Sequence, residues 1–304
     1  MIQKMELFKL IILTLLFASC STTRQVLRER GDEFYPQLIN RQKTLIKQYE
    51  KITDKRKSGW LLPTGCDSAI WSYTANAFAG CLPTFKARAN EYDTKGKFGR
   101  RPKESGRCWI GKKNGSRSTW SRDQAHGLLL YGLKCKDKDI VSDHLDFARS
   151  QWWFTADGEF PERWAAGYYN PLFRGLLGTV AHNLGVNTWE RFWPEFHQSG
   201  HDDYVAKLQA LEIYIRSFIS GELSYQQKQR VMEHIERDAN DIFFSSLGAK
   251  FGLINFRLGV EGCLTNEPYG GQYVRCENRP ECLLSQRLQS CGILLEVYTD
   301  GKAN

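Results

Sequence analysis

The sequence predicts a mainly α-helical protein of paired antiparallel helices, (α/α)-toroid-like or an irregular helical bundle, with a small disulfide-rich C-terminal appendage. Apolar residues recur every three or four positions through most of residues 121–247, and helix start and stop signals separate the segments. Four of the nine cysteines follow residue 260. The 304 residues, 41% hydrophobic and 25% charged, suffice for one large domain or two, and exclude a disordered chain or a polytopic membrane protein.

The first nineteen residues have the pattern of an export signal. The apolar run Leu10 to Phe17 is too short to cross about 30 Å of hydrocarbon as a helix. The sequence Ala18-Ser19-Cys20 that follows resembles the lipobox of bacterial lipoproteins, although Phe17 replaces the usual aliphatic residue. The resemblance implies that residues 1–19 are removed, that Cys20 is lipidated, and that Ser21 directs the chain to the outer membrane.

Residues 20–58 are expected to form the lipid anchor and an amphipathic tether helix. Apolar residues at helical spacing predict the helix, and Gly59 and Pro63 end it. These apolar residues are Val26, Leu27, Phe34, Leu38, Leu45, Tyr49 and Ile52.

A helical domain is expected over residues 59–260. It contains a basic segment at 86–122 with twelve Lys or Arg against three acidic residues. We expect this segment to be a long loop because it is rich in glycine. Ser121 and Gln124 then form a predicted capping box, and a second helix is expected over 139–154. Its buried stripe would be Val141, Leu145, Ala148 and Trp152.

Three further helices have recognisable ends. Asn170 as the cap, Pro171 at the first helical position and Gly185 beyond the end frame one helix. Another is expected from Asp202 to Gly221. A capping box of Ser224 and Gln227 opens the last, which is expected to continue to about Leu247.

Residues 261–304 are expected to be the disulfide-rich appendage, with one strand-like run from Ile293 to Tyr298. Without Cys20 an even number of cysteines remains and no C-x-x-C pair occurs, so we predict disulfides rather than a zinc site, and no metal or cofactor. Sequence order does not give the pairing. The eight cysteines are Cys66, Cys81, Cys108, Cys135, Cys263, Cys276, Cys282 and Cys291.

All nine tryptophans lie between residues 60 and 193, and the stretch 152–169 is the densest. We expect Trp152 and Trp189 to be core residues on helix faces. Trp164, Tyr168 and Tyr169 are candidates for a sugar site, because aromatic faces can cover the C–H face of a pyranose while nearby carboxylates and Arg bind its hydroxyls.

The segment from Trp120 to Gly127 places aromatic, Arg, Asp and His side chains at one helix start. This start, followed by paired helices and an aromatic acidic loop, resembles the (α/α)-toroid glycoside hydrolases and polysaccharide lyases over about residues 117–185. The resemblance implies a glycan-active fold. The predicted substrate-binding residues are Trp120, Arg122, His126, Trp164, Tyr168, Tyr169 and Arg174.

Two reactions remain open at this stage. Glycoside hydrolysis requires two carboxyl groups, for which the candidates are Asp123 with Asp157 or Glu159. Elimination on a uronic acid requires a Tyr or His base and a group that neutralises the carboxylate. The candidates for that reaction are Tyr168, Tyr169, Asn170, Arg174 and His182.

The expected function is therefore that of an envelope lipoprotein that cleaves a cell-envelope or anionic polysaccharide. The alternative is a non-catalytic lipoprotein that binds an anionic envelope polymer or a partner protein through the basic loop. The formal charge of +8 favours anionic partners, but an envelope location makes nucleic acid an improbable one. The oligomeric state is not predicted.

Overall fold

The computed structural model describes residues 32–56, 58–61, 68–81, 84–92, 94–102, 120–155, 167–192, 203–238, 241–265 and 280–299. This part of the chain is mainly helical, as predicted, and its only β structure is two isolated bridges, between Glu91 and Phe98 and between Phe154 and Tyr168. Its helices are α2 (Tyr35–Thr53), α3 (Ser68–Ala79), α4 (Thr84–Ala87), α5 (Arg122–Cys135), α6 (Lys138–Ser150), α8 (Pro171–Asn183), the 3₁₀ turn η2 (Glu190–Phe192), α9 (Asp203–Ser220), α10 (Tyr225–Arg237), α11 (Ile242–Lys250), α12 (Phe256–Leu264) and α13 (Pro280–Thr299).

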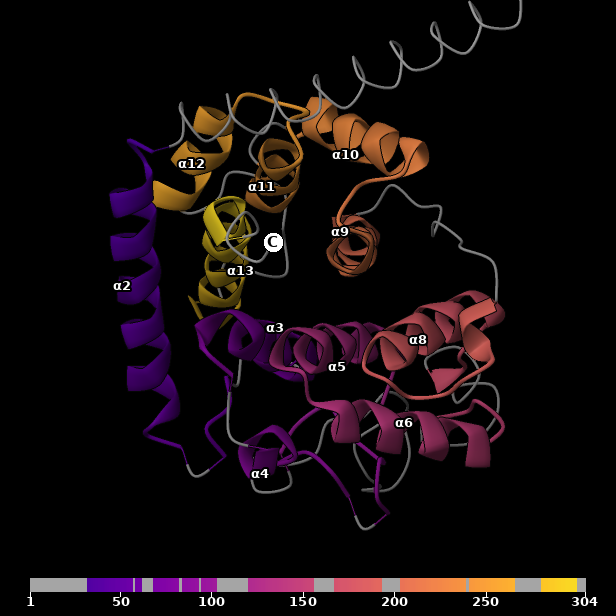
Figure 1. Cartoon of the computed structure of the whole chain (residues 1–304). Helices are drawn as coiled ribbons and strands as arrows, with labels where there is room; N and C mark the ends of the chain where they lie inside the picture. The colour runs from indigo at the N-terminus through magenta and orange to yellow at the C-terminus, as the bar shows by residue number, and fades with distance from the viewer. Residues whose placement is uncertain are drawn as a thin grey trace, which may run out of the picture.

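The helices pack around one apolar core. In Figure 1, α3, α5 and α8 cross the middle of the molecule and α6 lies below them. Helix α3 packs against α5, α6 packs against both α5 and α8, and α9 packs against α5, α8 and α11. None of the helices in the described ranges is long and apolar enough to span a bilayer.

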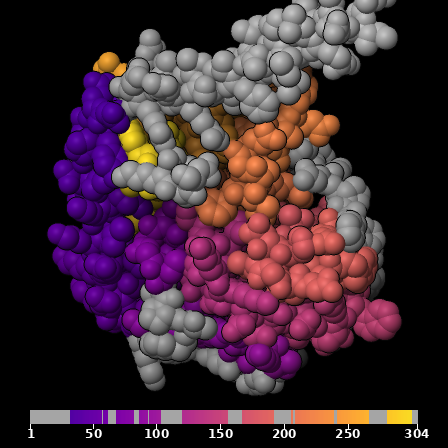
Figure 2. Space-filling view, in the orientation of Figure 1, coloured from indigo at the N-terminus to yellow at the C-terminus, as the bar shows by residue number. Residues whose placement is uncertain are grey.

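The first and last described helices are neighbours. The side-chain amide of Gln42 in α2 donates to the carbonyl of Phe78 in α3 at 2.9 Å and to that of Leu288 in α13 at 3.4 Å. Figure 2 shows the yellow surface of α13 between indigo α2 and the orange helices. The expected tether helix is thus present, but it packs on the body of the protein, with Leu38, Leu45 and Tyr49 buried.

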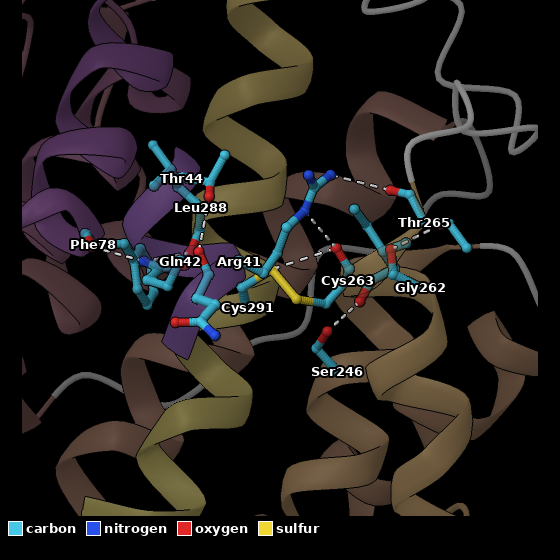
Figure 3. Close-up of a disulfide and its surroundings, with 12 residues drawn as sticks. Arg41, Gln42, Thr44, Phe78, Ser246, Gly262, Cys263, Thr265, Leu288 and Cys291 are labelled. Carbon is cyan, nitrogen blue, oxygen red and sulfur yellow. Dashed lines mark hydrogen bonds between the residues drawn. A yellow bond between two sulfur atoms is a disulfide. The ribbon is translucent and has the colours of Figure 1, made fainter. Parts of the chain in front are cut away.

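Two disulfides join described residues, Cys81 to Cys135 and Cys263 to Cys291. The second links α12 to α13, and Arg41 of α2 donates to the carbonyl of Cys263 beside it at 3.3 Å (Figure 3). Cys282 is also disulfide-bonded, to a cysteine outside the described residues. The predicted disulfides are confirmed for these five cysteines, whereas Cys20, Cys66, Cys108 and Cys276 lie outside the described residues.

A buried ionic cluster joins four helices. The ammonium groups of Lys134 in α5 and Lys250 in α11 both contact the carboxylate of Glu296 in α13, and the hydroxyl of Tyr214 in α9 donates to it at 2.5 Å. Burial alone would raise the pKa of Glu296, but the two lysines lower it below its usual value. Glu296 is therefore ionised and holds the C-terminal helix in the core.

Several sequence expectations are confirmed by local geometry. Asn170 accepts a hydrogen bond from the backbone of Phe173 and caps α8, and Gly185 adopts a positive φ just beyond that helix. The capping box of Ser224 and Gln227 opens α10. Gly221 adopts a positive φ directly after α9, whereas Asp202 lies outside the described residues.

Four expectations about helices are wrong. The capping box expected at Ser121 is not formed: Ser121 makes no side-chain cap on α5, and the side chain of Gln124 accepts a hydrogen bond from the backbone of Ile70 at 3.1 Å. The helix expected over 139–154 ends at Ser150. The helix that begins after Ser224 stops at Arg237, and α11 begins separately after the capping residue Asp241.

The fourth error concerns the C-terminal region. The strand-like run 293–298 belongs to α13, where Ile293 and Leu294 are buried, since an apolar run of this length fits a buried helix as well as a strand. A disulfide near the C-terminus is present as expected. The helix that it holds packs on α2, α3, α11 and α12 and so belongs to the core.

Candidate functional site

A pocket of about 80 Å³ lies where the N-terminal ends of α5 and α8 meet the side of α9. It is smaller than the roughly 300 to 1,000 Å³ of sites for drug-sized ligands, so it can take one substituent or a water molecule rather than a whole oligosaccharide. Its lining consists of Arg122, Asp123, His126, Asn170, Leu172, Phe173 and Glu212.

Helix α5 supplies three of the predicted residues to this pocket. Arg122 and Asp123 occupy the first turn and His126 follows one turn later, so these three side chains share one end of the helix. Asp123 lies in the first turn of α5, near the positive end of the helix dipole. These three predicted residues therefore line one pocket.

The imidazole of His126 has a defined tautomer. Its Nδ1 lies 2.9 Å from the carbonyl oxygen of Arg122, and because a carbonyl only accepts, Nδ1 carries the hydrogen and Nε2 has the free lone pair. Burial lowers the pKa of His126 to about 4, although the nearby Asp123 acts in the opposite direction. His126 is thus neutral at pH 7.

Glu212 of α9 brings a second carboxylate to the pocket. The guanidinium of Arg216, one turn along the same helix, donates to its Oε1 from Nε at 3.2 Å and from Nη2 at 3.0 Å, and both side chains are buried. Glu212 was not among the site residues predicted from the sequence. The available signal was an i,i+4 pair of opposite charges inside the apolar pattern of α9.

The N-terminal end of α8 forms the opposite wall. Asn170 uses its side-chain oxygen to cap Phe173 at 2.9 Å, which leaves its amide nitrogen for other partners. The ring of Phe173 meets that of His126 edge to face, with centroids 5.0 Å apart. This packing fixes the imidazole against the pocket wall.

Two predicted substrate-binding residues, Trp120 and Tyr169, are buried beneath the pocket. The indole Nε1 of Trp120 donates to the hydroxyl of Tyr169 at 2.7 Å, and that hydroxyl also contacts Nε2 of His144 at 2.7 Å. His144 hydrogen-bonds the carbonyl of Gly96 through Nδ1 at 2.9 Å. These side chains satisfy one another inside the core, so they position the start of α5 rather than present a face to a sugar.

Tyr168 and Arg174 form a separate cluster on the outer side of α8. The guanidinium of Arg174 donates to the Tyr168 hydroxyl at 3.0 Å and lies 4.7 Å from the ring centroid of Trp153. Neither residue lines the pocket. His182, at the far end of α8, contacts the guanidinium of Arg191.

Asp157, Glu159 and Trp164 lie outside the described residues. Trp152 and Trp189 were expected to be core residues. This expectation is wrong, because they are 83% and 56% exposed.

Part of the charge in the basic segment is neutralised within the protein. Arg88 pairs with Glu91 at 2.8 Å and with Asp143 at 2.5 Å, and Lys95 pairs with Asp143 at 2.9 Å. Arg100 is buried. The expected long loop also contains structured backbone, including the end of α4 and the bridge between Glu91 and Phe98.

The pocket is therefore lined by two carboxyl groups on different helices, a neutral imidazole and one guanidinium group. A second guanidinium group binds one of the two carboxylates. Within the described ranges no group of three His, Cys, Asp or Glu side chains is placed to hold a metal ion. No protein-family model, curated protein or solved structure matches this chain.

Proposed function

We propose that this protein is an envelope lipoprotein that hydrolyses a glycan at the pocket between α5, α8 and α9. The observation that supports the proposal is the presence of Asp123 and Glu212 on facing helices of one pocket. Glycoside hydrolysis uses a pair of carboxyl groups, one as the proton donor and the other as the base or nucleophile.

The surroundings suggest which carboxyl takes which role. Glu212 accepts two hydrogen bonds from Arg216, and such charge-assisted bonds favour an ionised carboxylate. Glu212 is therefore the proposed base or nucleophile. Asp123, next to the neutral His126, is the proposed proton donor. This assignment replaces the expected partners Asp157 and Glu159 with a residue whose position is described.

Elimination on a uronic acid is the less favoured reaction. His126 has a free Nε2 at the pocket, but a pKa of about 4 makes it a weak base for removing a carbon-bound proton at neutral pH. The binding-only alternative is weakened because Arg88 and Lys95 of the basic segment already have acidic partners.

The cell-envelope location rests on the signal and Cys20. The small pocket supports a substrate that enters with one substituent while the remainder of its chain lies on the surface. Peptidoglycan and acidic envelope polysaccharides are polymers of this kind. In this proposal the protein contacts the membrane only through its lipid anchor.

The test measures reducing ends and unsaturated products released from peptidoglycan and from acidic polysaccharides by the full-length protein. Asp123→Asn and Glu212→Gln should each lower turnover about a hundredfold or more, the loss expected for a general acid or base. Glu233→Gln, on the exposed side of α10, is the matched control and should retain turnover. Unsaturated products would indicate elimination, and full turnover in both pocket variants would refute the assignment.

A further inference from the structure

Two tryptophans, Trp152 and Trp189, have exposed side chains. Trp152 follows the C-terminus of α6 and Trp189 precedes the 3₁₀ turn η2. They are the only tryptophans of the described ranges whose side chains are classed as exposed, at 83% and 56%. An exposed tryptophan ring offers a large apolar face on which a ligand can stack.

The backbone that carries Trp152 is strained. Trp152 and Trp153 have φ values of 54° and 70°, in the left-handed region that glycine normally occupies. Non-glycine residues in this region are strained, and this kind of strain gathers at functional positions. The consecutive pair turns one indole outward, while the other packs beneath the guanidinium of Arg174, 4.7 Å from its ring centroid.

The strained turn is held firmly on both sides. The backbone nitrogen of Trp153 donates to the carbonyl of Ala148 at 2.7 Å, and its own carbonyl accepts from the nitrogen of Tyr169 at 2.9 Å. The nitrogen of Trp152 donates to the carbonyl of Arg149 at 3.1 Å. The exposed indole therefore stands on a fixed base, which lowers the entropy lost when a ligand stacks on it.

Arg149 also connects this turn to the segment that carries Trp189. Its guanidinium donates to both carboxylate oxygens of Glu190, at 2.9 and 2.6 Å, and to the hydroxyl of Thr188 at 3.1 Å. Glu190 is fully buried; burial would raise its pKa, but the hydrogen bonds from Arg149 and Thr188 lower it. One buried ion pair thus joins the two segments that carry the exposed rings.

The exposed residues that precede Trp152 in the chain are polar. Asp146 and Ser150 are exposed on the last turns of α6, and Gln151 precedes Trp152. A protein interface would need a contiguous apolar centre, and a lipid surface would favour basic neighbours rather than Asp146. Aromatic faces beside carboxylate, hydroxyl and amide groups fit a sugar ring, whose C–H face is apolar and whose edge carries hydroxyls.

We propose that Trp152 and Trp189 form a platform that binds the sugar rings of a glycan chain outside the pocket. The platform takes uncharged ring faces, since Arg149 is neutralised by Glu190 and Asp146 would repel a dense polyanion. The choice of glycan as the ligand rests on the proposed function.

The test uses the full-length protein and insoluble peptidoglycan sacculi in a sedimentation assay. Trp152→Ala and Trp189→Ala should each weaken binding about five- to tenfold, corresponding to the roughly 1 kcal/mol of an aromatic stacking contact. Tyr225→Ala, at a 74% exposed aromatic on α10, is the matched control and should bind normally. Vesicles of phosphatidylglycerol and phosphatidylethanolamine form the second arm.

A further variant separates binding from folding. Trp152→Gly removes the strain of a left-handed tryptophan, so its melting temperature should equal or exceed that of the unmodified protein while binding to sacculi falls. Normal binding by both alanine variants, no binding by the unmodified protein, or tryptophan-dependent binding to vesicles alone would overturn the platform. Tryptophan-dependent binding without glycan turnover would retain the platform and refute the hydrolase.

Discussion

The indole nitrogen of Trp120 lies 2.7 Å from the hydroxyl oxygen of Tyr169, and this hydrogen bond ties the start of α5 to the start of α8. Both residues are buried, and the same hydroxyl contacts His144 of α6. The walls of the pocket therefore depend on a contact made beneath it. Removing this contact should therefore lower the free energy of unfolding.

Tyr169→Phe should lower the free energy of unfolding by about 1 to 3 kcal/mol, because the buried hydroxyl that pairs Trp120 with His144 is removed while the ring stays in place. Urea denaturation followed by circular dichroism measures the change. Tyr225→Phe, at an exposed position, should shift stability by no more than about 0.5 kcal/mol. Equal losses of unfolding free energy in the two variants would show that the hydrogen bonds of the Tyr169 hydroxyl do not stabilise the protein.

Stability should fall as the pH drops from about 6.5 to 4. Burial lowers the pKa of both His126 and His144 to about 4, so between these values the unfolded chain binds protons that the folded chain does not. Each histidine contributes a slope of up to about 1.4 kcal/mol per pH unit, with stability higher at the higher pH.

The slope is measured by urea denaturation at pH 7, 6 and 5. His144→Gln should reduce it by about half the histidine contribution, whatever the variant does to stability at pH 7. An unchanged slope would mean that His144 titrates normally in the folded protein. Asp123, Arg122 and Arg216 act on His126, so the remaining slope should respond to salt more than the His144 component does.

The two described disulfides should differ in their accessibility to a reductant. Cys81 is exposed, whereas Cys263 and Cys291 are fully buried. Brief treatment of the native protein with dithiothreitol, followed by alkylation and mass mapping, should label Cys81 and Cys135 first. Labelling of Cys263 and Cys291 should require denaturant, and simultaneous labelling of both pairs would contradict the expected order.

Losing both disulfides should also lower the melting temperature. The loops that they close span sequence separations of 54 and 28 residues. A chain-entropy calculation gives stabilisations of about 4 and 3.5 kcal/mol for loops of these lengths. Calorimetry of the oxidised and reduced protein measures the combined effect of these two disulfides and that of Cys282, and identical transitions would exclude a stabilising role.

Cys20→Ser should abolish incorporation of labelled fatty acid and release the processed chain from membranes. The reason is that the thioether anchor requires the cysteine thiol that follows Ala18-Ser19. Ser21→Ala is the neighbouring control and should keep the label. Continued labelling of the Cys20 variant would refute the lipoprotein assignment.

The features that could be predicted from sequence are those fixed by a few adjacent residues. Asn170 before Pro171, and Ser224 with Gln227, satisfy helix-end groups within one turn, and both caps are present. Ser121 failed as a capping box because Gln124 binds the backbone of Ile70, 54 positions away. Here a tertiary contact outcompetes a local one.

The candidate site shows the same division. Arg122, Asp123 and His126 could be grouped from their spacing on one helix. Glu212 could not be assigned to them, because it reaches the pocket from a helix about ninety positions further along the chain. Trp152 was wrongly expected in the core because the helical period continues past Ser150, whereas the left-handed turn rotates its side chain to the surface.

The contact between α2 and α13 has a consequence for the order of folding. The side chain of Gln42 cannot bind the carbonyl of Leu288, 246 positions away, until that part of the chain has been synthesised. The same holds for the hydrogen bond from Arg41 to the carbonyl of Cys263. During synthesis α2 therefore emerges long before α13, and the face of α2 that packs on α13 stays uncovered until α13 has been made. Truncation within α13 should accordingly leave α2 without this packing surface.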